Sequence, residues 1–124
     1  MKSCCYQIEC KCPTVKAKKF DKMVRDKIPE ILRADPNVES FLVEQLPSSR
    51  LYAREKLVEE AKEAANAIPR DELLAELGDL LEVMLKVAKD NNIKFEEILF
   101  TMVEKQQKCG KFDKNIILKE IVYK

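Results

Sequence analysis

The sequence contains no histidine and only two glycines, and these absences exclude several kinds of functional site. Without histidine, the chain lacks the commonest general base and the commonest zinc ligand, and its four serines cannot form a Ser-His-Asp triad. Gly78 and Gly110 alone cannot supply a glycine-rich phosphate loop or a dinucleotide fingerprint. Any chemistry must therefore use carboxylates, lysines, arginines or a bound metal ion.

A large net charge is also missing, because 23 basic residues nearly balance 22 acidic ones. A domain with a net charge of +1 lacks the basic surface that duplex nucleic acid normally requires. No apolar run approaches the roughly 18–20 residues of a membrane span, and residues 1–19 lack the apolar region of a signal peptide. For a chain of 124 residues, we therefore expect one cytoplasmic domain that binds neither a membrane nor duplex nucleic acid.

Most of the cysteines gather near the amino terminus. They are Cys4, Cys5, Cys10 and Cys12. Such a cluster could hold zinc, but its spacings do not match the usual knuckle, in which two to four residues separate the ligands. Residues 1–19 also show no hydrophobic periodicity. We favour a poorly ordered extension over a metal knuckle, with the folded domain spanning residues 20–124.

Beyond this extension the chain becomes helical in character. Asp26 can cap a short helix that has Pro29 in its first turn and that Pro36 stops. Residues 38–46 and 115–124 are partly alternating or rich in β-branched side chains, and they can form a short pair of strands.

Three long amphipathic helices are predicted over residues 50–67, 72–90 and 94–108. Pro69 breaks the first of these runs, and Gly110 is a suitable terminator for the last. Short links between long helices indicate an all-α, antiparallel helix bundle. The helix at 72–90 is apolar around much of its circumference, so we expect a homo-oligomer in which the bundle reaches the four-helix type.

Two groups of acids are spaced for metal binding. The chain reads Glu59-Glu60-Ala61-Lys62-Glu63, then twelve residues, then Glu76-Leu77-Gly78-Asp79. Acids three positions apart lie on one face of a helix, and here that face also carries apolar residues, where a carboxylate is costly unless paired or metal-bound. Two such helices can close a cage of four carboxylates around a hard divalent cation. Solvated helix faces with simple salt bridges are the alternative interpretation.

These segments resemble a known family. Residues 56–63 and 76–83 are similar to the EExxE…ExxD signature of the all-α nucleoside triphosphate pyrophosphohydrolases, the MazG and phosphoribosyl-ATP pyrophosphatase superfamily. Residues 22–31 are similar to the KLVRDKIPEII opening of one MazG-like branch, and residues 108–112 stand where that branch tends to have Arg-Gly-Gly-Phe. The resemblance covers residues 20–118 and leaves the cysteine-rich extension outside it.

The resemblance implies hydrolysis of an NTP or dNTP, including noncanonical ones in a house-cleaning role, to a nucleoside monophosphate and pyrophosphate. Family members assemble as dimers or tetramers. The implied ligands of Mg²⁺, or of Mn²⁺ in its place, are Glu60, Glu63, Glu76 and Asp79. Glu59 is the candidate second-metal ligand or water-orienting base, with an edge glutamate paired to Lys62 as the alternative. The candidate phosphate-binding cations are Arg25, Lys27, Lys56, Lys105 and Lys108.

The chain departs from the family pattern in its last motif. Cys109 replaces the arginine of that stretch, and Lys111 replaces its second glycine. A lysine cannot reproduce the bidentate fork of arginine. This departure keeps a second hypothesis open, a helical nucleotide-binding or assembly module without turnover. A phosphoribosyl-ATP pyrophosphatase is a further alternative, ranked lower because residues 22–31 match the MazG-like branch better.

Overall fold

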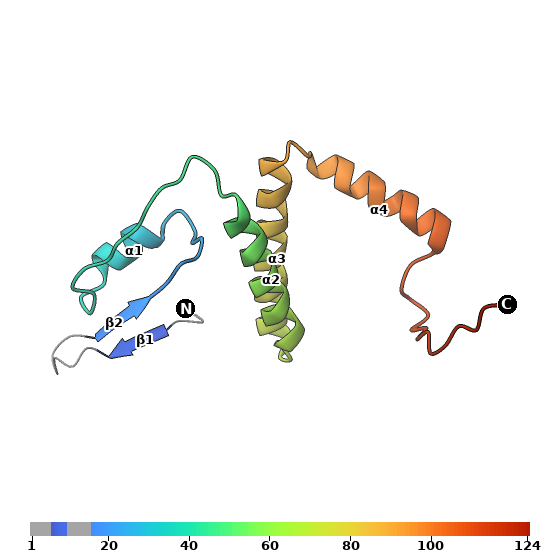
Figure 1. Ribbon diagram of the computed structural model, residues 1–124, viewed down its shortest axis with the longest axis horizontal. Coiled ribbons are helices and arrows are strands. Elements are labelled where there is room, and N and C mark those ends of the chain that lie inside the picture. Colours follow the sequence, from blue (N-terminus) through green and yellow to red (C-terminus); the bar gives the residue numbers. More distant parts are fainter. Residues whose placement is uncertain (1–5, 10–15) are drawn as a thin grey trace.

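The computed structural model describes residues 6–9 and 16–124, and within these ranges the protein consists of a β-hairpin followed by four helices (Figure 1). The strands are β1 (Tyr6–Glu9) and β2 (Lys16–Lys19), and the helices are α1 (Ile28–Ala34), α2 (Leu51–Asn66), α3 (Arg70–Asp90) and α4 (Phe95–Cys109). The predicted all-α class is confirmed, and the three long helices begin and end within two residues of the predicted positions.

The small β-element forms at a different place from the one that the sequence indicated. β1 and β2 pair antiparallel, with Tyr6 opposite Lys19. The predicted pairing of residues 38–46 with residues 115–124 is wrong, since neither range contains a strand. The reason is visible in Figure 1: α4 carries the carboxyl-terminal segment away from the segment that precedes α2. Cys4, Cys5, Cys10 and Cys12 lie outside the described residues.

The short helix α1 is present, but its predicted cap is wrong. Lys27, not Asp26, occupies the N-cap position, and its side chain makes no capping hydrogen bond. Pro29 lies at the start of the helix, where a missing backbone N–H does no harm and the fixed φ favours the helical turn. The helix therefore begins because of its proline and not because of a capping carboxylate.

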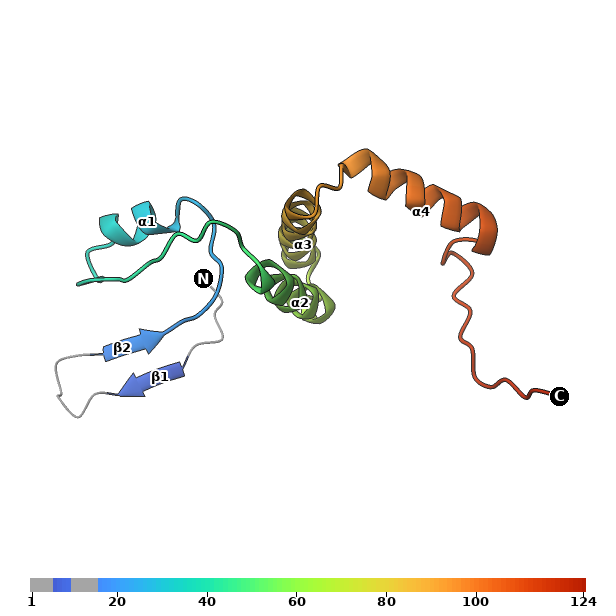
Figure 2. The same ribbon diagram turned by 45° about the horizontal axis from the view of Figure 1, so that its top comes forward.

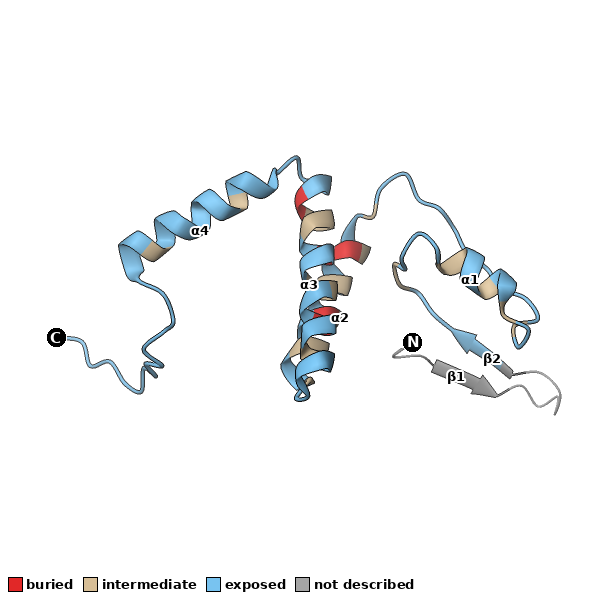
Figure 3. Cartoon of the chain, turned by 180° about the vertical axis from the view of Figure 1, so that it is seen from behind, coloured by how far each residue is buried: buried red, intermediate tan, exposed pale blue. Residues whose placement is uncertain are grey.

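α2 and α3 form an antiparallel pair that contains most of the buried residues (Figures 1 and 2). The buried apolar side chains are few and mostly small: Ala53, Val83 and Ala88. Two acids, Glu60 and Glu76, are buried with them (Figure 3). Small residues allow the two helices to approach closely, but so little apolar burial stabilises a single chain only weakly.

α4 does not return along α3 to complete a bundle within one chain. It points away from the α2–α3 pair in both views (Figures 1 and 2), and among the described elements it packs extensively on none. The link is short, with Asn92 at a φ of 56° and the Ile93 amide donating to the Ala88 carbonyl, 2.8 Å away. Thus α2 is the antiparallel neighbour of α3, whereas α4, which was expected to be a second one, does not pack along it, and Phe100 of α4 remains 68 % exposed.

A polar contact joins the start of α2 to the end of α3. The Ser49 hydroxyl donates a hydrogen bond to one carboxylate oxygen of Asp90, and Lys86 Nζ lies 2.8 Å from the other. The hydrogen bonds from Lys86 and Ser49 hold the pKa of Asp90 below its usual range. This contact helps to align the two helices that carry the buried acids.

Replacing Asp90 with Asn should lower stability at neutral pH. Because the folded-state pKa is lowered, the contribution of Asp90 is present above its unfolded pKa and is lost as the pH falls through the folded-state pKa. Urea denaturation at pH 7 should show a lower midpoint for Asp90→Asn, and the difference should shrink in strong acid. Asp113→Asn, which changes an exposed aspartate after α4, is the matched control. Equal midpoints at pH 7 would show that this contact does not stabilise the helix pair.

Candidate metal centre

Three carboxylates converge between α2 and α3. Glu60 and Glu63 extend from α2 and Glu76 from α3, and one oxygen of each lies within 4.8 Å of the others. Glu60 and Glu76 are each only 6 % exposed. The three-residue spacing on α2 places both of its acids toward α3, because residues three apart stand on one helix face. The geometry therefore brings together three of the four carboxylates that the sequence predicted as metal ligands.

The electrostatics of this cluster favour a cation. Burial raises the pKa of Glu63 to about 7, together with its hydrogen bond to Glu76 and the neighbouring negative charge of Glu60. One oxygen of Glu60, Oε2, is buried without a hydrogen-bond partner in the part of the chain that the structure describes. A buried carboxylate oxygen in this state is costly unless a cation compensates it. Three hard oxygen donors around this point suit Mg²⁺ or Mn²⁺, so the residues present fit a divalent ion.

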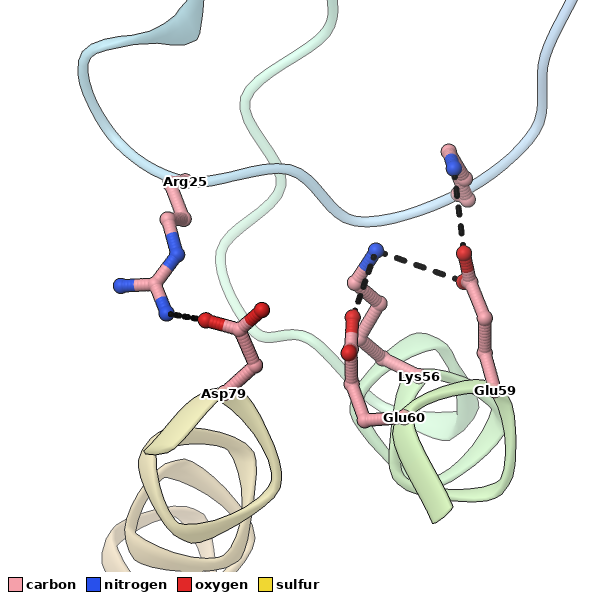
Figure 4. Close-up of polar contacts among 6 residues, drawn as sticks. Arg25, Lys56, Glu59, Glu60 and Asp79 are labelled. Atoms are coloured by element: carbon pink, nitrogen blue, oxygen red, sulfur yellow. Dashed lines mark hydrogen bonds and ion pairs between the residues drawn. The ribbon is translucent and has the colours of Figure 1, made fainter. Parts of the chain in front are cut away.

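Asp79, the fourth predicted ligand, lies beside the cluster and forms an ion pair with an arginine. Arg25 Nη2 lies 2.7 Å from Asp79 Oδ1 (Figure 4). Arg25 Nη1 lies 3.5 Å from Glu82 Oε1. The Asp79 side chain is 43 % exposed, in contrast to Glu60 and Glu76. One oxygen of Asp79 is thus engaged by Arg25, and Asp79 is not among the three carboxylates that converge, so its role as a metal ligand stays a prediction.

Glu59 lies next to the cluster and is held by two lysines. Lys22 Nζ is 3.1 Å from Glu59 Oε1, and Lys56 Nζ is 3.3 Å from Glu59 Oε2. Burial raises the pKa of Glu59, but the hydrogen bonds and charges of Lys22 and Lys56 outweigh burial and lower the pKa overall. The sequence had suggested Lys62 as the ion-pair partner of Glu59, but in the structure Lys22 and Lys56 are its partners. Glu59 is thus an ionised carboxylate with both oxygens engaged (Figure 4).

Of the predicted phosphate-binding cations, two contact acids at or beside the candidate metal centre, and the other three have no contact with it among the described residues. Lys56 lies at the site, with Nζ 3.4 Å from Glu60 Oε1, and Arg25 lies at its edge on Asp79. Lys27 is exposed at the start of α1. Lys105 and Lys108 are on α4, which leads away from this site in the same chain (Figure 1).

Sequence reasoning missed the part played by Lys22. Lys22 was visible only as the first residue of the stretch 22–31 that resembles the MazG-like opening. Its partner Glu59 is 37 positions away, and helical periodicity gives no information on a contact between a loop and a distant helix. The family-like stretch at residues 22–31 was the available signal, because it carries both Lys22 and Arg25.

A family model for the MazG nucleotide pyrophosphohydrolase domain matches residues 49–111, just over half of the chain. The chain belongs to this family, and the resemblance seen in the sequence is confirmed. The matched range contains α2, α3 and α4 and therefore all the acids of the candidate metal centre. Searches of curated proteins and of solved structures found no significant match. Among the described residues, no helix is long and apolar enough to cross a membrane.

Proposed function

We propose that the protein is a Mg²⁺-dependent nucleoside triphosphate pyrophosphohydrolase that converts an NTP or dNTP, including noncanonical ones, to a nucleoside monophosphate and pyrophosphate. The observation that carries this proposal is the convergence of Glu60, Glu63 and Glu76, with a buried Glu60 oxygen that lacks a partner among the described residues, in a chain of the MazG family. Mn²⁺ is the alternative ion. A cytoplasmic house-cleaning role, the removal of unwanted nucleotides, accords with this activity.

We infer the roles of the acids from their positions. Glu60, Glu63 and Glu76 would hold the ion, and Asp79, which Arg25 engages in the structure, would be a further ligand. Bound Mg²⁺ would neutralise charge on the triphosphate and favour ionisation of a water molecule. We assign the role of water-orienting base to Glu59, which lies beside this cluster, and we assign contact with a phosphate group to Lys56, which contacts Glu59 and Glu60 in the structure.

The partner of the protein is proposed to be a second copy of itself, in a homodimer or homotetramer. Two observations support this: among the described residues, only Ala53, Val83 and Ala88 are buried apolar side chains, and α4 does not cover the side of α3 that α2 leaves exposed. A neighbouring subunit that covers α3 would also supply cations from its own α4. Lys105 and Lys108 would then act in the active site of the adjacent subunit.

Pyrophosphate release from a panel of NTPs, dNTPs and modified triphosphates, with Mg²⁺ and with EDTA, tests the proposed activity. We expect turnover of at least one triphosphate that stops when EDTA removes the metal. Including phosphoribosyl-ATP in the panel tests the lower-ranked alternative. Tight binding of a non-hydrolysable nucleotide in calorimetry, without turnover of any substrate, would instead favour the binding module that the altered Cys109–Phe112 stretch suggests.

A further inference from the structure

The segment that joins β2 to α1 lies against both helices of the candidate metal centre. We call residues 20–27 the crossing segment. The Tyr52 hydroxyl of α2 donates a hydrogen bond to Asp21 Oδ1 over 2.7 Å, and Arg25 reaches Asp79 of α3 (Figure 4). The crossing segment is therefore attached to α2 at one end and to α3 at the other, so that it spans the open side of the helix pair.

Lys22 is the most enclosed cation of the crossing segment. Its side chain is 19 % exposed and that of its partner Glu59 is 18 % exposed, whereas the Arg25 side chain is 59 % exposed. The Lys22 ammonium also lies 5.9 Å from the centre of the Phe20 ring, where the face of an aromatic ring attracts a cation. An ion pair shielded from water in this way interacts more strongly than an exposed surface pair.

Lys22 is connected to the candidate metal centre through an unbroken series of charged contacts. Lys22 engages one oxygen of Glu59, and Lys56 engages the other. Lys56 also contacts Glu60 Oε1, and the second oxygen of Glu60 is the buried atom that has no partner among the described residues. Because both Glu59 oxygens are held, its carboxylate cannot rotate freely, and its direction relative to Glu60 is fixed by cations on two different segments.

We propose that Lys22 is a positioning residue that holds the Glu59 carboxylate in one orientation beside the carboxylate cluster. Lys22 does this from outside the helix pair, so the crossing segment is a working part of the site and not only a connection to α1. The proposal rests on the proposed pyrophosphohydrolase activity. Lys56 alone cannot perform this task, because it is shared between Glu59 and Glu60 and would be drawn to either one.

The first test compares Lys22→Met with Lys22→Arg in steady-state pyrophosphate release. We expect Lys22→Met to lower kcat about tenfold to a hundredfold, the usual effect of losing a group that orients a site residue. KM should change by less than about threefold, because substrate binding is retained. Lys22→Arg keeps the charge and should recover most of kcat. Lys19→Met, which changes an exposed lysine three positions earlier, is the matched control and should behave as wild type.

The second test needs no turnover. In metal-free protein, Lys22→Met should lower the urea midpoint, and the same change in a Glu59→Gln background should produce a much smaller shift, because the ion pair is already lost. Should Lys22→Met fail to fold, Lys22→Gln replaces it in both tests with the same expectations.

The outcomes separate this inference from the activity on which it rests. An active wild type with an unchanged kcat in Lys22→Met would overturn the positioning role alone. So would a fall in stability without a fall in kcat, since that pattern belongs to a purely structural ion pair. Equal shifts of the urea midpoint in the wild-type and Glu59→Gln backgrounds would show that Lys22 does not act through Glu59. A wild type that hydrolyses no triphosphate would overturn both proposals.

Discussion

Replacing Glu63 with Gln is expected to lower pyrophosphate release about a hundredfold or more and to remove the response of the protein to Mg²⁺. Glu63 is one of three carboxylates whose oxygens lie within 4.8 Å of one another, and a neutral amide oxygen is a weaker ligand for a hard cation. The loss should appear mainly in kcat, because in the proposed reaction the ion would stabilise charge that develops in the transition state.

Thermal unfolding separates the loss of metal binding from a loss of folding. In EDTA at a pH above the Glu63 pKa of about 7, Glu63→Gln should be at least as stable as wild type, since it removes one negative charge from a cluster that has no ion to compensate it. In Mg²⁺, wild type should gain stability, by about 2.7 kcal/mol at a concentration one hundred times Kd, and the variant should gain much less.

The matched control for this experiment is Glu55→Gln. Glu55 is an exposed glutamate on the same helix, outside the group of three converging carboxylates. Its replacement should leave both turnover and the Mg²⁺ response unchanged. Equal activity and an equal Mg²⁺ response in wild type and Glu63→Gln would refute the proposed cage.

Replacing Leu81 with Lys should dissociate and largely unfold the protein. Leu81 is 45 % exposed on α3, and Leu74 and Leu77 are 61 % and 48 % exposed close by on the same side of the helix. At ~100° per residue, these side chains lie about 100–160° around α3 from Glu76, which faces α2. Among the described elements, α4 packs extensively on none and so does not cover them. If a second copy covers this face, a lysine there would be buried without a partner, which typically costs several kcal/mol.

Sedimentation velocity and far-UV circular dichroism at micromolar concentration measure this effect. Wild type should sediment as a dimer or larger species with a strong helical signal, and Leu81→Lys should lose both properties. Ile68→Lys is the control, because Ile68 is 89 % exposed in the turn between α2 and α3, away from the leucine face of α3. A wild type that sediments as a folded monomer would contradict the proposed subunit interface.

Substitution of Gly78 provides an independent test of whether a second subunit packs on the leucine face of α3. In the single chain, a Cβ added at Gly78 would meet no atom within 4 Å apart from those of its chain neighbours and the adjacent backbone of α3. From helix propensity alone, Gly78→Ala should then stabilise α3 by about 1 kcal/mol. A close-packed partner helix would reverse the sign of this effect, because the added methyl group would separate the two subunits.

Local sequence information was sufficient for the helices and for most of the cage. The spacing of apolar residues had already indicated the helices, and Pro69 and Gly110 mark two of their ends. Periodicity and terminating residues both act within a few turns of the chain, so the sequence shows them directly. The convergence of Glu60, Glu63 and Glu76 was predictable for the same reason. Helical spacing places acids on one face, and a short link makes two successive helices antiparallel neighbours.

Only the tertiary structure decided which cations meet these acids and where α4 goes. The pairing of Arg25 with Asp79 spans 54 positions and that of Lys22 with Glu59 spans 37. Such contacts depend on the path of the crossing segment, and helical periodicity gives no information on that path. The direction of α4 likewise follows from a few backbone angles around Asn92. The sequence by itself determined that carboxylates would gather on two helices, and the fold determined that the crossing segment would bring lysine and arginine to them.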